Sequence, residues 1–342
     1  KKLKLPLELY EEPFVDFAAT RNRVLQLASN KTEFVLMLSG DETLENAEHL
    51  RTFVQLHSGF CGSTEELFNL RVFMGPEQWY WSERLLKADN HAVPGWPAGN
   101  NSWRYVSVTH EAYVHPTKTM GGDLFIQYVG DVDPRGSATG MPAPVPGPFF
   151  IMHDADRTAD DRTRSLRRDV RLLEGYLARD DARLDEWQYA RALYYLAQSL
   201  KGLGFGDAAA DTWLRFLALE VSKRRTFSYL AQGAQQGLGQ LCVAEPREAE
   251  EALPARCASH FEEAFKLCPR AEPLVMLASS LPRGDPQRLL ALKRAQEVVP
   301  MEAQTGHCIV AAESWVYSAV PQLLAEEESF LAMSNSAPRM TT

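Results

Sequence analysis

A run of five apolar residues at positions 34–38 leads directly into the tetrapeptide Ser-Gly-Asp-Glu at 39–42. An apolar run of this length predicts a strand that is buried on both faces, as in the sheets of α/β proteins. Gly40 lets the backbone turn sharply, which places Asp41 at the carboxyl end of the strand. Ligands of open α/β sheets bind at that end, and a carboxylate there suits a divalent cation that carries phosphate.

The same turn has a second interpretation, a helix cap. Asp41 or Thr43 can cap a helix over residues 44–55, because their side-chain oxygens accept hydrogen bonds from free backbone N–H groups. Short acidic motifs occur in many unrelated folds, so these residues alone leave both interpretations open. The rest of the chain has to distinguish them.

The bulk composition limits the classes of protein to consider. With 342 residues the chain is long enough for two domains, and 45% hydrophobic and 24% charged residues are ordinary for a globular protein. A net charge of −9 disfavours a nucleic-acid surface, which needs a basic patch. No apolar run approaches the roughly 20 residues that span a bilayer, so we expect no membrane span.

Five cysteines are scattered along the chain without the spacing of a metal site. We therefore expect reduced, mostly buried thiols and a cytoplasmic protein. The first residue is Lys1 rather than Met, which leads us to expect that the chain begins part-way through a longer protein. A location in the Golgi lumen is the alternative if a targeting segment precedes it.

The two halves of the chain follow different patterns, and we expect one domain over residues 1–155 and another over 160–333. In the first half, a helical apolar spacing at 21–28 precedes the run at 34–38, and this order of helix, buried strand and acidic turn predicts an α/β sheet. The proline-rich stretch at 136–148 predicts a loop, because proline lacks the N–H that helices and central strands need. Further strands are predicted at 70–73, 103–108, 124–129 and 149–152.

The second half is helical almost throughout. Apolar residues recur at spacings of three and four, and a glycine turn at Gly204 separates two of the helices. Units of two helices cannot bury their apolar faces singly, so several are expected to stack into an all-α repeat domain. Helical pairs are predicted at 190–204 with 207–216, 229–241 with 260–267, and 273–281 with 286–298.

Two groups of side chains in this half have simple structural interpretations. The acidic run at 326–328 is expected to be a solvated face. Large aromatic residues at helical spacing are expected to form inter-helix core rather than a ligand box. These aromatic residues are Trp213, Phe216, Phe265, Trp315 and Tyr317.

Three polar side chains of the first half are candidates for binding a nucleotide. Arg21 and Asn22 stand near the start of a predicted helix, where a guanidinium and free backbone N–H groups can bind a nucleotide or pyrophosphate. The alternative for Arg21 is a surface salt bridge, for instance with Asp16, and the residues favour neither. Arg71, on the predicted strand at 70–73, is a further candidate contact to a nucleotide.

Two histidines at strand ends complete the candidates. The alternating strand at 103–108 ends in His110 and Glu111, and a carboxylate there can act as a general base on an attacking hydroxyl. Glu111 can equally pair with an arginine. His153 follows the last predicted strand and can complete a metal site with Asp41, although a lone histidine is more often structural. No GxGxxG, GxSxG or P-loop signature is present, which disfavours hydride transfer, serine hydrolysis and P-loop chemistry.

Taken in order, these segments resemble one known family, the family-two-like glycosyltransferases fused to tetratricopeptide repeats. The resemblance implies a partial GT-A fold, which is Rossmann-like, followed by tetratricopeptide-like helices. It also implies an inverting transfer of a sugar from a nucleotide-sugar donor to an acceptor hydroxyl of a glycan, peptide or small molecule. The stretches that carry it are DFAATRN at 16–22, the acid pair at 41–42, WRYVSVTHE at 103–111, YYLAQ at 194–198 and PRAEPL at 269–274.

The resemblance also implies roles for single residues. Asp41 resembles the metal-binding acid of the family's DxD motif, and His153 resembles its late histidine, which closes the shell of Mn²⁺ or Mg²⁺. Glu111 resembles the carboxylate that deprotonates the acceptor hydroxyl. The residues expected beside the substrate or nucleotide are Arg21, Asn22, Ser39, Arg71 and His110.

Two departures from the family pattern leave a second hypothesis open. Ser39 stands where the first acid of the DxD motif is expected. The family's opening strands, which form much of the nucleotide pocket, come before the point at which this chain begins. We therefore expect either a piece of a longer protein or a homologue without activity. In the second case the chain is a non-catalytic scaffold whose helical repeats hold a protein partner.

Overall fold

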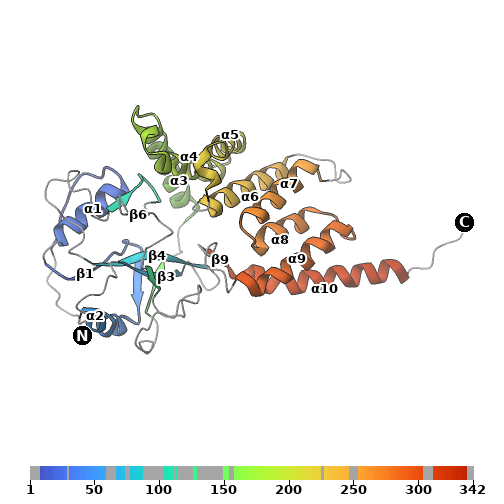
Figure 1. Ribbon diagram of the computed structural model, residues 1–342, viewed down its shortest axis with the longest axis horizontal. Coiled ribbons are helices and arrows are strands. Elements are labelled where there is room, and N and C mark those ends of the chain that lie inside the picture. Colours follow the sequence, from blue (N-terminus) through green and yellow to red (C-terminus); the bar gives the residue numbers. More distant parts are fainter. Residues whose placement is uncertain are drawn as a thin grey trace, which may run out of the picture.

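The computed structural model describes the chain in several separate stretches. It has small mixed sheets in the N-terminal region, followed by a mostly helical C-terminal part of packed helix pairs (Figure 1). The described residues are 8–28, 31–58, 67–73, 78–87, 104–110, 112–114, 126–128, 149–153, 158–224, 227–245, 253–302 and 311–336.

The main sheet joins strands from both ends of the chain. Its strands are β1 (Phe34–Leu36), β2 (Glu42–Glu45), β3 (Leu67–Phe73), β4 (Gln78–Lys87), β7 (Ile126–Tyr128), β8 (Phe150–His153) and β9 (Ala311–Glu313). Their order is β1-β4-β3-β8-β2, with β7 also beside β3 and β9 also beside β4. A separate two-stranded sheet pairs β5 (Arg104–Val106) with β6 (Ala112–Val114).

Strand direction places several carboxyl ends together. Strands β1 and β3 are both antiparallel to β4, whereas β7 and β8 are parallel to β3. Strands β1, β3, β7 and β8 therefore run in one direction, and their carboxyl ends point to the same edge of the sheet. This edge is where the acidic turn after β1 and the end of β8 lie.

Two helices, α1 (Phe17–Ala28) and α2 (Ala47–Ser58), cover opposite faces of the main sheet (Figure 1). Successive strand residues point to opposite faces, and β4 shows this alternation. Leu85 packs in the core on the α2 side, whereas Leu86 packs in the core on the α1 side. The N-terminal region is therefore a layer of strands between two helices.

The predicted strands are present where the structure describes them. The strand predicted at 34–38 is confirmed as the three-residue β1, and both of its faces are packed: Val35 toward α1 and Leu36 toward α2. The loop predicted at 136–148 lies outside the described residues. The other predicted strands correspond to β3, β5, β7 and β8.

The helix predicted over 44–55 is wrong in its start. The chain first forms β2, and α2 begins only at Ala47. Asp41 and Thr43 therefore do not cap it. Asn46, in the left-handed region with φ of 54°, makes the turn between strand and helix.

The C-terminal part is built of consecutive helices that pack in pairs. Its helices are α3 (Ala159–Leu177), α4 (Glu186–Gly202), α5 (Gly206–Leu217), α6 (Ser228–Ala244), α7 (Ala255–Leu267), α8 (Ala271–Ser280), α9 (Pro286–Glu302) and α10 (Ser314–Ser336). The closest neighbours are α3 with α4, α4 with α5, α6 with α7 and α8 with α9, and α10 lies along α8 and α9 (Figure 1). The three predicted helical pairs are confirmed.

Large aromatic residues of one helix pack against small residues of the next. Trp213 and Phe216 of α5 are buried as predicted, and Phe265 packs partly buried against another cluster. A Cβ atom on Gly237 would lie 2.3 Å from the Trp213 ring, so only glycine lets α6 approach α5 this closely. The side chains of the two other predicted core aromatics, Trp315 and Tyr317, lie outside the description.

The acidic run at 326–328 is only partly the solvated face that the sequence predicts. Glu326 and Glu328 are exposed, but the side chain of Glu327 is 1% exposed. Its carboxylate accepts hydrogen bonds from Arg288 Nε at 2.7 Å and from the Gly284 N–H at 2.6 Å. The prediction is wrong for Glu327 because α10 turns this residue toward the start of α9.

The expectation of reduced thiols is wrong for three of the five cysteines. Cys242 of α6 and Cys257 of α7 form a disulfide, with Cα atoms 5.4 Å apart. Cys268 is disulfide-bonded as well. The prediction of a cytoplasmic protein rested on reduced thiols, so it now stands without that support.

Strand β9 directly precedes α10, yet it pairs with β4 of the N-terminal sheet, which the helical pattern of this half did not predict. None of the helices within the described ranges combines the length and the apolar character that crossing a bilayer requires.

Candidate functional site

The acidic turn and the end of β8 meet at the carboxyl edge of the sheet. Strand β2 pairs with β8 so that Glu42 stands opposite His153. This register brings the preceding residue to the same place, and Asp41 Oδ2 lies 3.4 Å from His153 Nε2. Both side chains reach solvent, with exposed fractions of 35% for Asp41 and 15% for His153. The sheet therefore brings together the two residues that were predicted to share a metal ion.

Glu42 fixes the acidic turn from inside. Its carboxylate accepts a hydrogen bond from Arg84 Nη2 at 2.6 Å and another from the Ser39 N–H at 2.8 Å. The Glu42 and Arg84 side chains are only 2% and 7% exposed. The Arg84 carbonyl in turn accepts the Met37 N–H at 2.7 Å, which ties the turn to β4. Glu42 thus has a structural role, and Asp41 is the acid that faces solvent.

Arg21 extends from α1 to the same turn. Its Nη2 lies 3.4 Å from Ser39 Oγ, and its guanidinium carbon lies 5.4 Å from the centroid of the Tyr105 ring. Asp16, the partner in the alternative prediction, caps α1 by accepting the Ala19 N–H at 2.6 Å. A positive side chain is therefore present beside Ser39 and the acidic turn.

Asn22 joins α1 to β5. Its Nδ2 donates to the Tyr105 carbonyl at 2.8 Å, and its Oδ1 accepts the Tyr105 N–H at 2.8 Å. The side-chain amide thus makes the two bonds that a neighbouring strand would make. This contact places Tyr105, and with it the ring beneath Arg21.

The predicted acceptor-side residues lie at the junction with the helical part. The His110 ring stacks on Tyr195 of α4, with centroids 4.1 Å apart and planes at 8°. The His110 carbonyl accepts a hydrogen bond from Arg191 Nη2 at 2.8 Å. Glu111 lies outside the described residues, and of Arg71 the structure describes the backbone in β3 but not the side chain.

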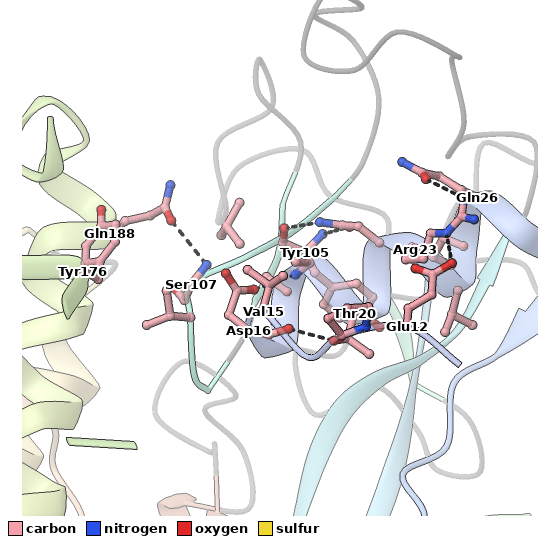
Figure 2. A pocket seen from close by; sticks show the side chains of 18 of the residues that line it. Glu12, Val15, Asp16, Thr20, Arg23, Gln26, Tyr105, Ser107, Tyr176 and Gln188 are labelled. Atoms are coloured by element: carbon pink, nitrogen blue, oxygen red, sulfur yellow. Dashed lines mark hydrogen bonds and ion pairs between the residues drawn. The ribbon is translucent and has the colours of Figure 1, made fainter. Parts of the chain in front are cut away.

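A groove of about 930 Å³ opens between α1 and the corner of the helical part formed by α3 and α4 (Figure 2). Its volume is within the range of roughly 300–1,000 Å³ that is typical of ligand sites. Burial, with the Asp185 carboxylate nearby, raises the pKa of Tyr176 to about 12, so this groove phenol stays protonated at neutral pH. Polar described residues of its wall include Glu12, Asp16, Asn22, Arg23, Tyr105, Tyr176, Arg179, Asp181 and Gln188.

The groove and the acidic turn are formed by different residues. Arg21, Ser39, Asp41 and His153 are not among the described residues that line it. Tyr105 connects the two places, because it is part of the groove wall and its ring also lies beside Arg21. The candidate site therefore consists of the sheet edge at Asp41 and His153 and a neighbouring groove.

A carboxylate oxygen of Asp41 and an imidazole nitrogen of His153 can together hold a divalent ion with an open shell. Two ligand atoms that are each about 2.1 Å from an octahedral ion lie about 3 Å apart, close to the separation observed between these two side chains. Within the described stretches no group of three or more His, Cys, Asp or Glu residues surrounds a common point. Mg²⁺ and similar ions commonly take one or two protein ligands and complete their shell with water and substrate phosphates.

Sequence reasoning missed the residues that support the site. Arg84 was not singled out, although a lone arginine before two leucines on a strand is a signal for a buried ion pair. Tyr105 was seen only as part of an alternating strand. Arg191 and Tyr195 belong to a predicted helix, and no local pattern indicates that they face His110.

Comparisons with known proteins identify no relative for this chain. No protein-family model matches it. No curated protein and no solved structure is significantly similar to it.

Proposed function

We propose that the protein is a metal-dependent glycosyltransferase, with a partial GT-A-like sheet followed by tetratricopeptide-like helices. The observation that carries this proposal is the 3.4 Å approach of Asp41 Oδ2 to His153 Nε2. These side chains come from distant parts of the sequence and meet at the carboxyl edge of parallel strands, where ligands of α/β sheets bind. Arg21 adds positive charge beside the same turn, 3.4 Å from Ser39 Oγ.

Each residue of the edge has a role in this proposal. Asp41 and His153 would hold Mn²⁺ or Mg²⁺, which would supply positive charge beside the departing nucleoside diphosphate. Arg21 donates to the diphosphate oxygens, for which a planar guanidinium is well suited. Glu111 removes the proton from the acceptor hydroxyl as the sugar is transferred.

The helical part supports the second half of the proposal. Its helices pack in consecutive pairs, as repeats of two helices do. Gly204 and Gly284 both have φ of 85° and lie in the connections after α4 and α8. Gly204 directly follows the C-cap of α4, where a left-handed glycine lets the next helix fold back, whereas Gly284 lies in the turn just before α9.

Calorimetric titration with UDP or GDP, with and without Mn²⁺, tests the proposal. We expect heat of nucleotide binding that depends on Mn²⁺. Asp41→Asn and His153→Gln should each weaken that binding about tenfold or more, because each removes one of two protein ligands. Asp180→Asn, at an exposed aspartate of a surface turn, is the matched control and should bind as the wild type does. No metal-dependent heat, or Asp41→Asn binding as tightly as the control, would refute the proposal.

A second function, that of a non-catalytic scaffold, is favoured by one observation. No third carboxylate, histidine or cysteine joins Asp41 and His153 among the residues that the structure describes. In this case the N-terminal region is vestigial and the helical repeats hold a protein partner. The same titration distinguishes the two functions, because a scaffold binds neither nucleotide in the presence of Mn²⁺.

A further inference from the structure

The turn at residues 107–110, which follows β5, has an unusual backbone. Ser107 and His110 have φ of 80° and 47°, both in the left-handed region, and neither is a glycine. A residue with a side chain costs about 1–3 kcal/mol in a sparsely populated region of this kind. Contacts from the surrounding structure must therefore hold the turn.

Two helices hold the turn from different sides. The Val108 carbonyl accepts the Phe17 N–H at the start of α1, at 3.3 Å. The Ser107 N–H donates to Gln188 Oε1 of α4 at 3.2 Å (Figure 2). Gln188 is itself oriented by Asp185, whose Oδ2 accepts from Gln188 Nε2 at 2.6 Å. The turn is thus part of the interface between the N-terminal region and the helical part.

Arg191 of α4 makes the most specific of these contacts. It is 6% exposed, and its Nη2 donates to the His110 carbonyl at 2.8 Å. Its Nη1 donates to the Tyr229 hydroxyl at 3.1 Å. The guanidinium carbon lies 4.8 Å from the ring centroid of Trp187 and 5.1 Å from that of Tyr195. Ring faces and hydrogen-bond acceptors together fix the orientation of the guanidinium.

Tyr195, one helical turn after Arg191, holds the side chain of His110. Its ring and the His110 ring are stacked at 4.1 Å, with planes only 8° apart. The carbonyl and the imidazole of His110 are therefore both held by α4. Residues four apart lie on the same face of a helix, so a single stripe of α4 makes both contacts.

Arg191 and Tyr195 keep their protonation states at neutral pH. Burial acts to lower the pKa of Arg191, but the nearby phenols of Tyr195 and Tyr229 act in the opposite direction and the pKa is raised. Burial raises the pKa of Tyr195, although Arg191 opposes the shift. The guanidinium therefore stays charged and the phenol stays neutral.

We propose that Arg191 and Tyr195 of the helical part are positioning residues for the turn at 107–110, which they fix at His110. In the proposed function the next residue of the sequence, Glu111, is the base. The catalytic part of this inference rests on the proposed function, whereas the control of the turn does not. In this proposal one face of α4 contacts the N-terminal region and completes the transferase site.

Hydrogen–deuterium exchange of peptides that cover 104–110 tests the control of the turn. Arg191→Met keeps the bulk of the side chain and removes its hydrogen bonds, so we expect exchange in these peptides to rise about tenfold. Tyr229→Phe is the matched control, because it removes the other partner of the same guanidinium and leaves the His110 carbonyl contact. Exchange that is unchanged in Arg191→Met, or raised equally by Tyr229→Phe, overturns the proposal.

A second pair of variants keeps the test valid if Arg191→Met does not fold. Tyr195→Leu removes the stacked ring, whereas Tyr195→Phe keeps it. We expect faster exchange at 104–110 in the leucine variant alone, with equal exchange of both variants in peptides of α8 and α9. Equal exchange at 104–110 contradicts a role for the stacking.

Release of the nucleoside diphosphate from UDP- and GDP-sugars with Mn²⁺ tests the catalytic consequence. We expect Arg191→Met to retain the Mn²⁺-dependent binding of UDP or GDP and to lose turnover about tenfold or more. Full turnover in a variant with a loosened turn overturns the positioning role. A wild type that neither binds nor turns over refutes the proposed function, and the exchange experiment then decides the control of the turn by itself.

Discussion

Glu42 and Arg84 form a buried ion pair, with Oε1 and Nη2 2.6 Å apart, directly beside the solvent-facing Asp41. The pair joins the acidic turn to β4, and the same carboxylate accepts the Ser39 N–H. It explains why two adjacent acids have different roles. Glu42 holds the turn in place, and Asp41 is left to meet His153 at the edge of the sheet.

Glu42→Gln should therefore destabilise the protein strongly. The amide removes the charge of one partner of this buried ion pair, a change that typically costs about 3–5 kcal/mol. Urea unfolding measures the change in the free energy of unfolding. Glu45→Gln, at an exposed residue of the same strand, is the control and should change stability by less than about 0.5 kcal/mol. Equal stability of the two variants contradicts a structural role for Glu42.

Gly237→Ala should disrupt the packing of α6 on α5. The added Cβ would lie 2.3 Å from the Trp213 ring, and a shift of the ring or the helix should cost about 1–3 kcal/mol. Gly175→Ala in α3 is the control, because nothing lies within 4 Å of its Cβ position. Alanine should raise helix stability there by up to about 1 kcal/mol. Thermal unfolding that moves in the same direction for both variants contradicts the close approach.

The disulfide should contribute to the stability of the helical part. Cys242 and Cys257 are 15 residues apart, and closing a loop of this length stabilises a protein by roughly 3 kcal/mol. A Cys242→Ala/Cys257→Ala double variant should lose about that much in denaturant unfolding without reducing agent. Peptide mapping of the native protein should recover the two cysteines joined. Recovery of both as free thiols would show that the bond does not form.

His260 should make stability depend on pH. Burial, with Arg256 nearby, lowers its pKa from 6.5, so the folded protein holds this proton less tightly than the unfolded chain. Its contribution is therefore constant above about pH 6.5 and is lost as the pH falls from there toward the folded pKa. The stability difference between wild type and His260→Gln should shrink as the pH is lowered from about 7 to about 5. A difference that is constant or grows contradicts the lowered pKa.

The sequence predicted the elements of this fold better than their contacts. Helical spacing located α4 to α9, and the apolar run located β1, because both signals are local. Strand β9 was missed, since three residues that pair with a distant strand carry no periodic pattern of their own. The sequence predicts a surface position for Glu327 because the burial of this residue depends on Arg288, on another helix.

For the candidate site, too, the sequence predicted the positions of residues better than their contacts. Asp41 and His153 were expected together from their positions at strand ends, and the pairing of β2 with β8 brings them within 3.4 Å. The buried partner of Glu42 and the contact between His110 and α4 were not expected. Both depend on tertiary packing between segments that are far apart in the sequence, which local propensity does not encode.

The central claim is that Asp41 and His153 share a divalent ion. Anomalous diffraction from crystals soaked with Mn²⁺ and UDP tests it most directly. The account predicts a manganese peak about 2.1–2.2 Å from both Asp41 Oδ2 and His153 Nε2, with phosphate oxygens completing the shell. No manganese peak between the two side chains, with Asp41 and His153 still directly in contact, would contradict it.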